Sequence, residues 1–104
     1  MRVLSVRFKS SIPFEELHGP WLDVAPEIAS QPGLISKVWI HEDDLLGGIY
    51  LFRDQGSLDA YASGTIVAAI LGTPEFSDFR VEQYEASEDL SAITHAIPTT
   101  VVSA

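Results

Sequence analysis

The sequence predicts an α+β domain whose elements follow one another as strand, helix, strand, strand, helix, strand. Three observations carry this prediction. Two short segments, Val3–Lys9 and Phe76–Glu85, alternate apolar and polar residues, and two others, Leu34–His41 and Gly47–Arg53, are rich in apolar residues on both faces; both patterns are typical of strands. Between these segments apolar residues recur every three or four positions, which is typical of helices that pack on a sheet. Groups of proline and glycine separate the segments and indicate turns.

The N-terminal third contains the first strand and the first helix. Residues Val3–Lys9 alternate, and Pro13 is well placed to open the helix that follows. An apolar stripe runs along this helix and consists of Phe14, Leu17, Trp21, Leu22, Ala25, Ile28 and Ala29. Pro20 and Pro26 fall inside it, and a proline cannot donate a backbone hydrogen bond. We therefore expect either a kinked helix or, in preference, a helix that restarts near Pro20 and ends at Pro32–Gly33.

A hairpin follows, and both of its faces have the character of buried surfaces. Its strands are expected over Leu34–His41 and Gly47–Arg53, joined by the acidic turn Glu42–Asp44. One face is aliphatic, with Val38, Ile40, Ile49 and Leu51. The other is amphipathic, with Lys37, Trp39, His41, Tyr50 and Phe52. The pair Gly47–Gly48 indicates a bulge or a close backbone approach. Helices cover one face of such a sheet, so the other face needs a partner, and the sequence leaves open which is which.

The second half of the chain completes the pattern. Asp54 is expected to cap a second helix, which ends at Gly72–Pro74 and is locally weakened by Gly64, by about 1 kcal/mol relative to alanine. Its inward residues are Leu58, Tyr61, Ala62, Ile66, Ala69 and Ile70. Phe76–Glu85 alternates as a fourth strand, and Glu88–Ala96 adds a short helix. This order is the ferredoxin-like arrangement, a four-stranded antiparallel sheet with both helices on one side. We expect a single domain over residues 1–97 and a C-terminal tail over residues 98–104.

Composition limits the kinds of function that the chain can have. With 104 residues, 46% of them apolar, the chain is long enough for one domain with its own core. Fifteen acidic against six basic residues give a net charge of −9, which argues against nucleic acid or an anionic membrane surface as a partner. The absence of cysteine excludes disulfides and thiolate chemistry. No signal peptide or membrane-length apolar run is present, so we expect a cytoplasmic protein.

Motifs for metals, phosphates and common cofactors are missing from the sequence. The three histidines lie in different elements, without the spacing of a zinc site, and the acidic turn lacks the glycine and spaced ligands of a calcium loop. There is no Gly-x-Ser-x-Gly nucleophile elbow, no phosphate-binding loop and no nicotinamide or flavin fingerprint. We therefore expect no bound metal or cofactor.

The remaining candidate site is a group of aromatic residues that could enclose a flat apolar ligand between the helices and the sheet. The expected substrate-binding residues are Trp21, Lys37, Trp39, Phe52 and Tyr61, and the expected catalytic residues are His18 and Tyr50. We expect His18 on the inward stripe near Trp21, where a histidine suits the role of proton acceptor. Tyr50, Tyr61 and Lys37 would hold an oxyanion or ring hydroxyl groups. The same residues could instead form an aromatic core and a dimer contact.

Several motifs resemble the YdhR-like monooxygenase family. They are Pro32–Gly33–Leu34, Lys37–Val38–Trp39, Gly47–Gly48–Ile49–Tyr50–Leu51–Phe52, Asp54, Ala60–Tyr61 and Leu90–Ser91–Ala92–Ile93. The resemblance runs from Pro32 to about Ile97 and implies a dimeric α/β barrel, in which two ferredoxin-like sheets pack face to face. Related barrel families include cofactor-independent monooxygenases of polycyclic phenols, haem-degrading enzymes, and aldoxime- or lactone-processing proteins. The fold alone does not choose among these activities.

Three hypotheses follow. The first is a dimeric, cofactor-independent monooxygenase-like enzyme that oxidises a small aromatic substrate of the hydroquinone or phenol type. The second is a non-enzymatic module that binds a hydrophobic ligand or only assembles as a homodimer. The third is haem binding and degradation, with His18 or His41 as the axial ligand.

Overall fold

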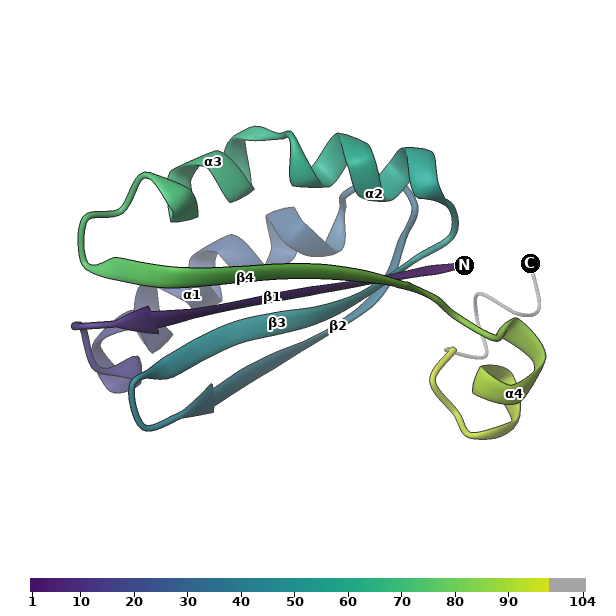
Figure 1. Ribbon diagram of the computed structural model, residues 1–104, viewed down its shortest axis with the longest axis horizontal. Coiled ribbons are helices and arrows are strands. Elements are labelled where there is room, and N and C mark those ends of the chain that lie inside the picture. The colour runs from purple at the N-terminus through teal and green to yellow at the C-terminus, as the bar shows by residue number, and fades with distance from the viewer. Residues whose placement is uncertain (98–104) are drawn as a thin grey trace.

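The computed structural model describes residues 1–97, which form a four-stranded antiparallel sheet with three helices on one face and a short C-terminal helix beyond one end of the sheet (Figure 1). In chain order the elements are β1 (Arg2–Ser10), α1 (Phe14–Ala29), β2 (Leu34–Glu42), β3 (Leu45–Phe52), α2 (Gln55–Ala62), α3 (Thr65–Leu71), β4 (Phe76–Glu85) and α4 (Glu88–Ile93). The strands lie in the order β2–β3–β1–β4. This confirms the ferredoxin-like arrangement. The expected tail, residues 98–104, lies outside the described residues.

Helix α1 is continuous, so the expected restart near Pro20 is wrong. Both Pro20 and Pro26 lie on the exposed side of the helix, where water can bond to the backbone carbonyl groups that lose their partners. The side chains that pack on the core follow a strict three-and-four spacing, at Phe14, Leu17, Trp21, Val24 and Ile28. Leu22, predicted for this stripe, lies one position beyond Trp21 and is exposed.

The register of the sheet decides which hairpin face meets the helices. Lys37 pairs with Tyr50 and Trp39 pairs with Gly48, so these residues point to the same side. On that side lie the buried residues Leu4, Val6 and Phe8 of β1. The amphipathic set therefore faces the helices, and the aliphatic set lies on the opposite face, where Val38 is 61% exposed.

Of the two explanations for the glycine pair, close backbone approach is correct. The register shifts lie elsewhere, between Leu34 and Ser36 in β2 and between Arg7 and Lys9 in β1. A Cβ atom on Gly47 would overlap the carbonyl oxygen of Val6 on the neighbouring strand. Position 47 therefore has no room for a side chain.

The expected second helix consists of two helices. Asp54 caps α2 as predicted, since its Oδ1 accepts a hydrogen bond from the Ser57 backbone N–H at 2.7 Å. However, α2 ends at Ala62, and α3 begins at Thr65 with Gly64 as its extended N-cap. A Cβ atom on Gly64 would lie 3.1 Å from the Ala60 carbonyl oxygen, so the bend between the two helices favours glycine. Beyond the bend, α3 continues on the same side of the sheet as α1 (Figure 1).

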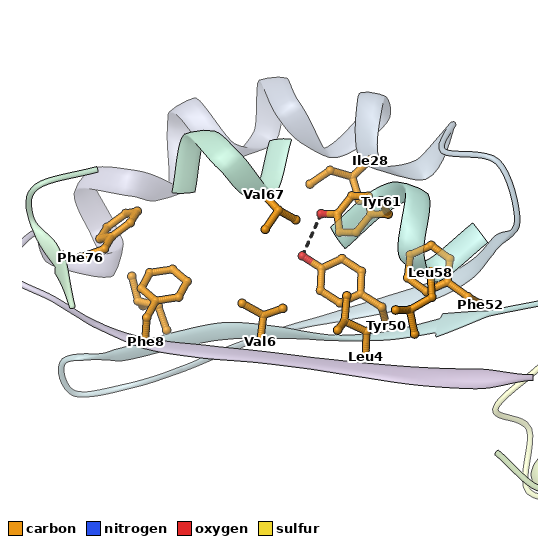
Figure 2. Close-up of a cluster of buried hydrophobic side chains, with 11 residues drawn as sticks. Leu4, Val6, Phe8, Ile28, Tyr50, Phe52, Leu58, Tyr61, Val67 and Phe76 are labelled. Atoms are coloured by element: carbon orange, nitrogen blue, oxygen red, sulfur yellow. Dashed lines mark hydrogen bonds between the residues drawn. The ribbon is translucent and has the colours of Figure 1, made fainter. Parts of the chain in front are cut away.

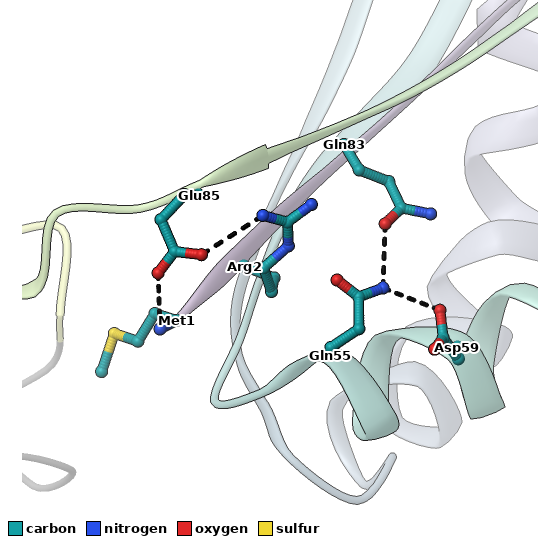
Figure 3. A network of polar contacts seen from close by, with 6 residues as sticks. All are labelled: Met1, Arg2, Gln55, Asp59, Gln83 and Glu85. Atoms are coloured by element: carbon teal, nitrogen blue, oxygen red, sulfur yellow. Dashed lines mark hydrogen bonds and ion pairs between the residues drawn. The ribbon is translucent and has the colours of Figure 1, made fainter.

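The core lies between the sheet and the helices, and polar contacts fix one end of it. Leu4, Phe52 and Leu58 are completely buried in this layer (Figure 2). At the end of the sheet, Gln55 of α2 donates a hydrogen bond to Gln83 of β4 at 2.9 Å, which ties the helix to that strand (Figure 3). Within residues 1–97, none of the helices is both long and apolar enough to cross a membrane.

Candidate active site

A cavity of about 430 Å³ lies between the sheet and the helices, within the size range of small-molecule sites. The sheet contributes Val6, Phe8, Lys37, Trp39, Gly48 and Tyr50. The helices contribute mainly Leu17, Trp21, Val24 and Ile28 of α1 and Ile66 and Ile70 of α3. This lining is largely apolar and aromatic, with few polar groups among it. A flat hydrophobic molecule with one or two polar substituents is the kind of ligand that it fits.

Gly48 makes room for the amine of Lys37. It lies on the helix-facing side of β3 between Trp39 on one neighbouring strand and Val6 on the other. A Cβ atom on Gly48 would come within 2.5 Å of Lys37 Cε and 3.3 Å of Lys37 Nζ. Because Gly48 has no side chain, the Lys37 side chain can fold over the strand and reach the cavity.

The Lys37 amine lies against two aromatic rings. Its Nζ lies 3.3 Å from the centroid of the Trp39 ring and 4.5 Å from that of Tyr50. None of the ion pairs formed within residues 1–97 includes Lys37. Burial lowers the pKa of Lys37 from 10.5 to about 7, because removal of water disfavours the charged form. At neutral pH a substantial share of this side chain is therefore an uncharged amine.

Tyr50 presents a neutral phenol to the same cavity. Its hydroxyl lies 3.0 Å from that of Tyr61, which donates the hydrogen bond (Figure 2). Burial raises the pKa of both tyrosines, and the proximity of Tyr61 raises the pKa of Tyr50 further. Two hydroxyl groups share one hydrogen bond, so one phenol proton stays free for a ligand.

The structure brings four of the seven predicted site residues together. Trp21, Lys37, Trp39 and Tyr50 all line the cavity. Tyr61 lies behind Tyr50, with the two ring centroids 5.0 Å apart, and does not line it. The expectation that Phe52 lines the slot is wrong, because its ring is completely buried against Tyr50 and Tyr61. Both residues support the cavity wall from behind.

The expected position of His18 is also wrong. His18 is exposed on α1 and does not line the cavity, because Leu17 and Trp21 occupy the inward positions of that part of the helix. His41 is exposed as well and stacks on Phe14, with ring centroids 3.8 Å apart. Neither histidine is therefore placed to ligate a haem inside the cavity. Residues 1–97 contain no group of three His, Asp or Glu side chains that could hold a metal ion.

Sequence reasoning missed several lining residues. Val6 and Phe8 belong to a strand far from the hairpin in sequence, and only the register places them beside it. Polar groups in the lining come from Glu27 of α1, from Thr65 at the start of α3 and from Thr73 in the turn after α3. Glu27 directly precedes Ile28, a predicted inward residue that is buried, and from this the sequence could have indicated that Glu27 flanks the inward stripe.

Comparison with known proteins gives a consistent result. The family described as "Putative mono-oxygenase ydhR" matches residues 3–97. No curated protein matches the chain. Among solved structures, a putative antibiotic biosynthesis monooxygenase from Deinococcus radiodurans has a TM-score of 0.69 at 14% identity, covering 85% of this chain and 94% of that chain.

Two further solved structures have the same fold. SnoaB, a cofactor-independent oxygenase from Streptomyces nogalater, has a TM-score of 0.66 at 15% identity, covering 84% of this chain and 93% of that chain. MhuD, a haem degrader from Mycobacterium tuberculosis with two haems bound in its active site, has a TM-score of 0.56 at 16% identity, covering 81% and 94%. At these identities the likeness shows a shared fold.

Proposed function

The chain belongs to the ydhR mono-oxygenase family, and from this premise we propose that it oxidises a small aromatic substrate of the hydroquinone or phenol type in the cavity between sheet and helices. The observation that carries the proposal is the cavity itself, in which Trp21, Trp39 and Tyr50 surround a single amine. Aromatic walls bind a flat ring by stacking, and the few polar groups orient its hydroxyl substituents.

The chemistry needs little from the protein beyond binding and charge stabilisation. A hydroxyarene that has lost its hydroxyl proton is electron-rich enough to pass electrons to dioxygen. A phenol and dioxygen give a quinone and water, so one oxygen atom enters the ring, the other leaves as water, and all the electrons come from the substrate. The protein removes water from the reactants, orients the ring and stabilises the anion.

The lining residues divide this work between them. Trp21 and Trp39 form the slot for the ring. Tyr50 keeps its proton and donates a hydrogen bond through its free O–H to the substrate oxyanion. Tyr61 is a positioning residue that holds the Tyr50 hydroxyl through their 3.0 Å hydrogen bond. His18, outside the cavity, has no part in this scheme.

We also propose that the protein is a cytoplasmic homodimer. The sheet face opposite the helices carries Val38, Ile40 and Ile49, and Val38 is 61% exposed. A specific interface buries about 800 Å² on each partner, which is the order of area that one face of a four-stranded sheet offers. Pairing of two such faces would remove this apolar surface from water and give the barrel that the family resemblance implies.

Oxygen uptake with a panel of hydroquinones, catechols and naphthols tests the proposal. We expect uptake with at least one of them, and a fall of tenfold or more in Trp39→Ala and Tyr50→Phe. Tyr84→Phe is the matched control for Tyr50→Phe, because Tyr84 lies on the opposite face of the sheet and does not line the cavity; native mass spectrometry of this control checks that it assembles as the wild type does. Tight ligand retention without uptake would contradict the enzyme and favour a hydrophobic-ligand-binding module.

A further inference from the structure

The proposed oxidation begins with the loss of a hydroxyl proton, and the cavity contains few groups that could accept it. The titratable side chains that line it are Lys37 on β2, Tyr50 on β3 and Glu27 on α1. The lining parts of β1 and α3 contribute none. Tyr50, with Tyr61 of α2 behind it, is a neutral phenol and therefore a proton donor. Glu27 lies in an exposed part of α1, where water competes for its carboxylate.

We propose that Lys37 is the catalytic base that takes the hydroxyl proton of the aromatic substrate, a role that rests on the proposed function. In this step the substrate O–H bond breaks and a new N–H bond forms at Lys37 Nζ. A neutral phenol and a neutral amine become a phenolate and an ammonium ion, and no proton leaves the cavity. Dioxygen is reduced only afterwards, by the phenolate.

The geometry suits both states of the amine. Before the transfer, Nζ lies in the cavity without an ion-pair partner among the described residues, and burial lowers the pKa of Lys37 to about 7. After the transfer, the ammonium ion lies 3.3 Å from the Trp39 ring centroid and 4.5 Å from that of Tyr50. Aromatic faces attract a cation, and the phenolate supplies a counter-charge. The ammonium form of Lys37 is therefore better stabilised when the phenolate is bound than when the cavity is empty.

Gly48 is a positioning residue for this base. Its missing side chain leaves the space that Lys37 Cε and Nζ occupy above the strand. A methyl group there would displace the amine from the Trp39 ring without removing any polar atom from the cavity. The glycine at this position thus serves the chemistry of the site as well as its shape.

The protonation state of Lys37 can be measured directly, because the chain contains only two lysines, Lys9 and Lys37. Protein labelled with ¹³C at the lysine ε position gives two NMR signals, and a Lys9→Arg variant assigns them. We expect the Lys37 signal to titrate near pH 7. A Lys37 signal that stays that of an ammonium ion beyond about pH 9 would overturn the proposal.

A proton count separates a base from a simple counter-cation. Under anaerobic conditions near pH 8, 2-naphthol is neutral in water, and its anion has a distinct absorption spectrum. We expect the wild-type protein to bind it as the anion without releasing a proton to the buffer. Lys37→Arg should bind the anion and release about one proton per naphthol, because arginine is already charged. Lys37→Met should bind the neutral form. Binding of neutral naphthol by the wild type would overturn the proposal.

Oxygen uptake distinguishes failure of this inference from failure of the proposed function. We expect turnover to fall by about 10²- to 10⁴-fold in both Lys37→Met and Lys37→Gln, with Lys9→Met as the matched control. Unchanged turnover in folded Lys37 variants would contradict the role of Lys37 as the base but not the proposed oxidation. If the protein ionised bound naphthol but no substrate gave oxygen uptake, the role of Lys37 would stand and the proposed oxidation would be contradicted.

Discussion

Replacement of Lys37 by methionine should make the protein more stable, by an amount that decreases as pH rises. In the folded state burial lowers the pKa of Lys37 from 10.5 to about 7. Between these two pH values the unfolded chain holds a proton that the folded chain lacks, so the wild-type free energy of unfolding rises with pH through this window. Below pH 7 both states are protonated, and the folded protein bears the full cost of the buried charge.

The size of the effect follows from the shift. At 1.36 kcal/mol per pH unit, the full cost of the buried ammonium ion is about 5 kcal/mol. We therefore expect Lys37→Met to be more stable than the wild type by up to about 5 kcal/mol at pH 6. This advantage should shrink by about 3 kcal/mol by pH 9, because pH 9 lies two units above the folded pKa of Lys37.

Urea unfolding of both proteins at pH 6, 7, 8 and 9 measures this difference. Lys9→Met is the matched control, because Lys9 is exposed and its only described ion pair is a 3.8 Å contact with Asp78. An exposed pair of this kind contributes about 0–1 kcal/mol. If the Lys37→Met advantage were the same at every pH, Lys37 would not release its proton on folding, and the reasoning about its burial would be refuted.

Four further predictions concern other parts of the molecule. Gly48→Ala should lower hydroquinone turnover and raise the pH at which the Lys37 NMR signal titrates, because the new Cβ would lie 2.5 Å from Lys37 Cε; an unmoved titration would contradict this. Val38→Asp should give monomeric or insoluble protein on native mass spectrometry, and an intact dimer would exclude that sheet face as the interface. Asp54→Ala should lose about 1 kcal/mol in urea unfolding through the lost α2 cap, with no change in turnover. Tyr61→Phe should cost about 1 kcal/mol and reduce turnover less than Tyr50→Phe; equal reductions would mean that Tyr61 touches the substrate.

The order of the elements could be predicted from the sequence because it depends on local patterns. Val3–Lys9 and Phe76–Glu85 alternate over most of their length, and both form strands close to the expected bounds. Asp54 caps α2 through a bond to its own neighbour Ser57, which is again a local interaction. Pro20 misled the prediction, because the cost of a proline inside a helix depends on whether water can reach the carbonyl group that it leaves unpaired.

The candidate site was only partly predictable, because it depends on how each helix is rotated about its axis and on the register in which the strands pair. A shift of one residue along a helix turns a side chain by about 100°, which separates the exposed His18 from the inward Leu17. The role of Gly48 depends on Trp39 and Val6, which the register of two other strands brings to its sides. The unusual environment of Lys37 follows from this arrangement, and no motif in the sequence indicates it.

The two layers of the domain separate reactivity from selectivity. Lys37 and Tyr50, which bear the reactive groups, project from adjacent strands of one hydrogen-bonded sheet. Ile66 and Ile70, which shape the opposite wall, belong to α3, a helix of seven residues bounded by Gly64 and Gly72. Substitutions in that helix can alter which molecules fit without moving the amine or the phenol. The architecture thus lets the substrate range of the protein diverge in evolution, or be redesigned, around unchanged chemistry.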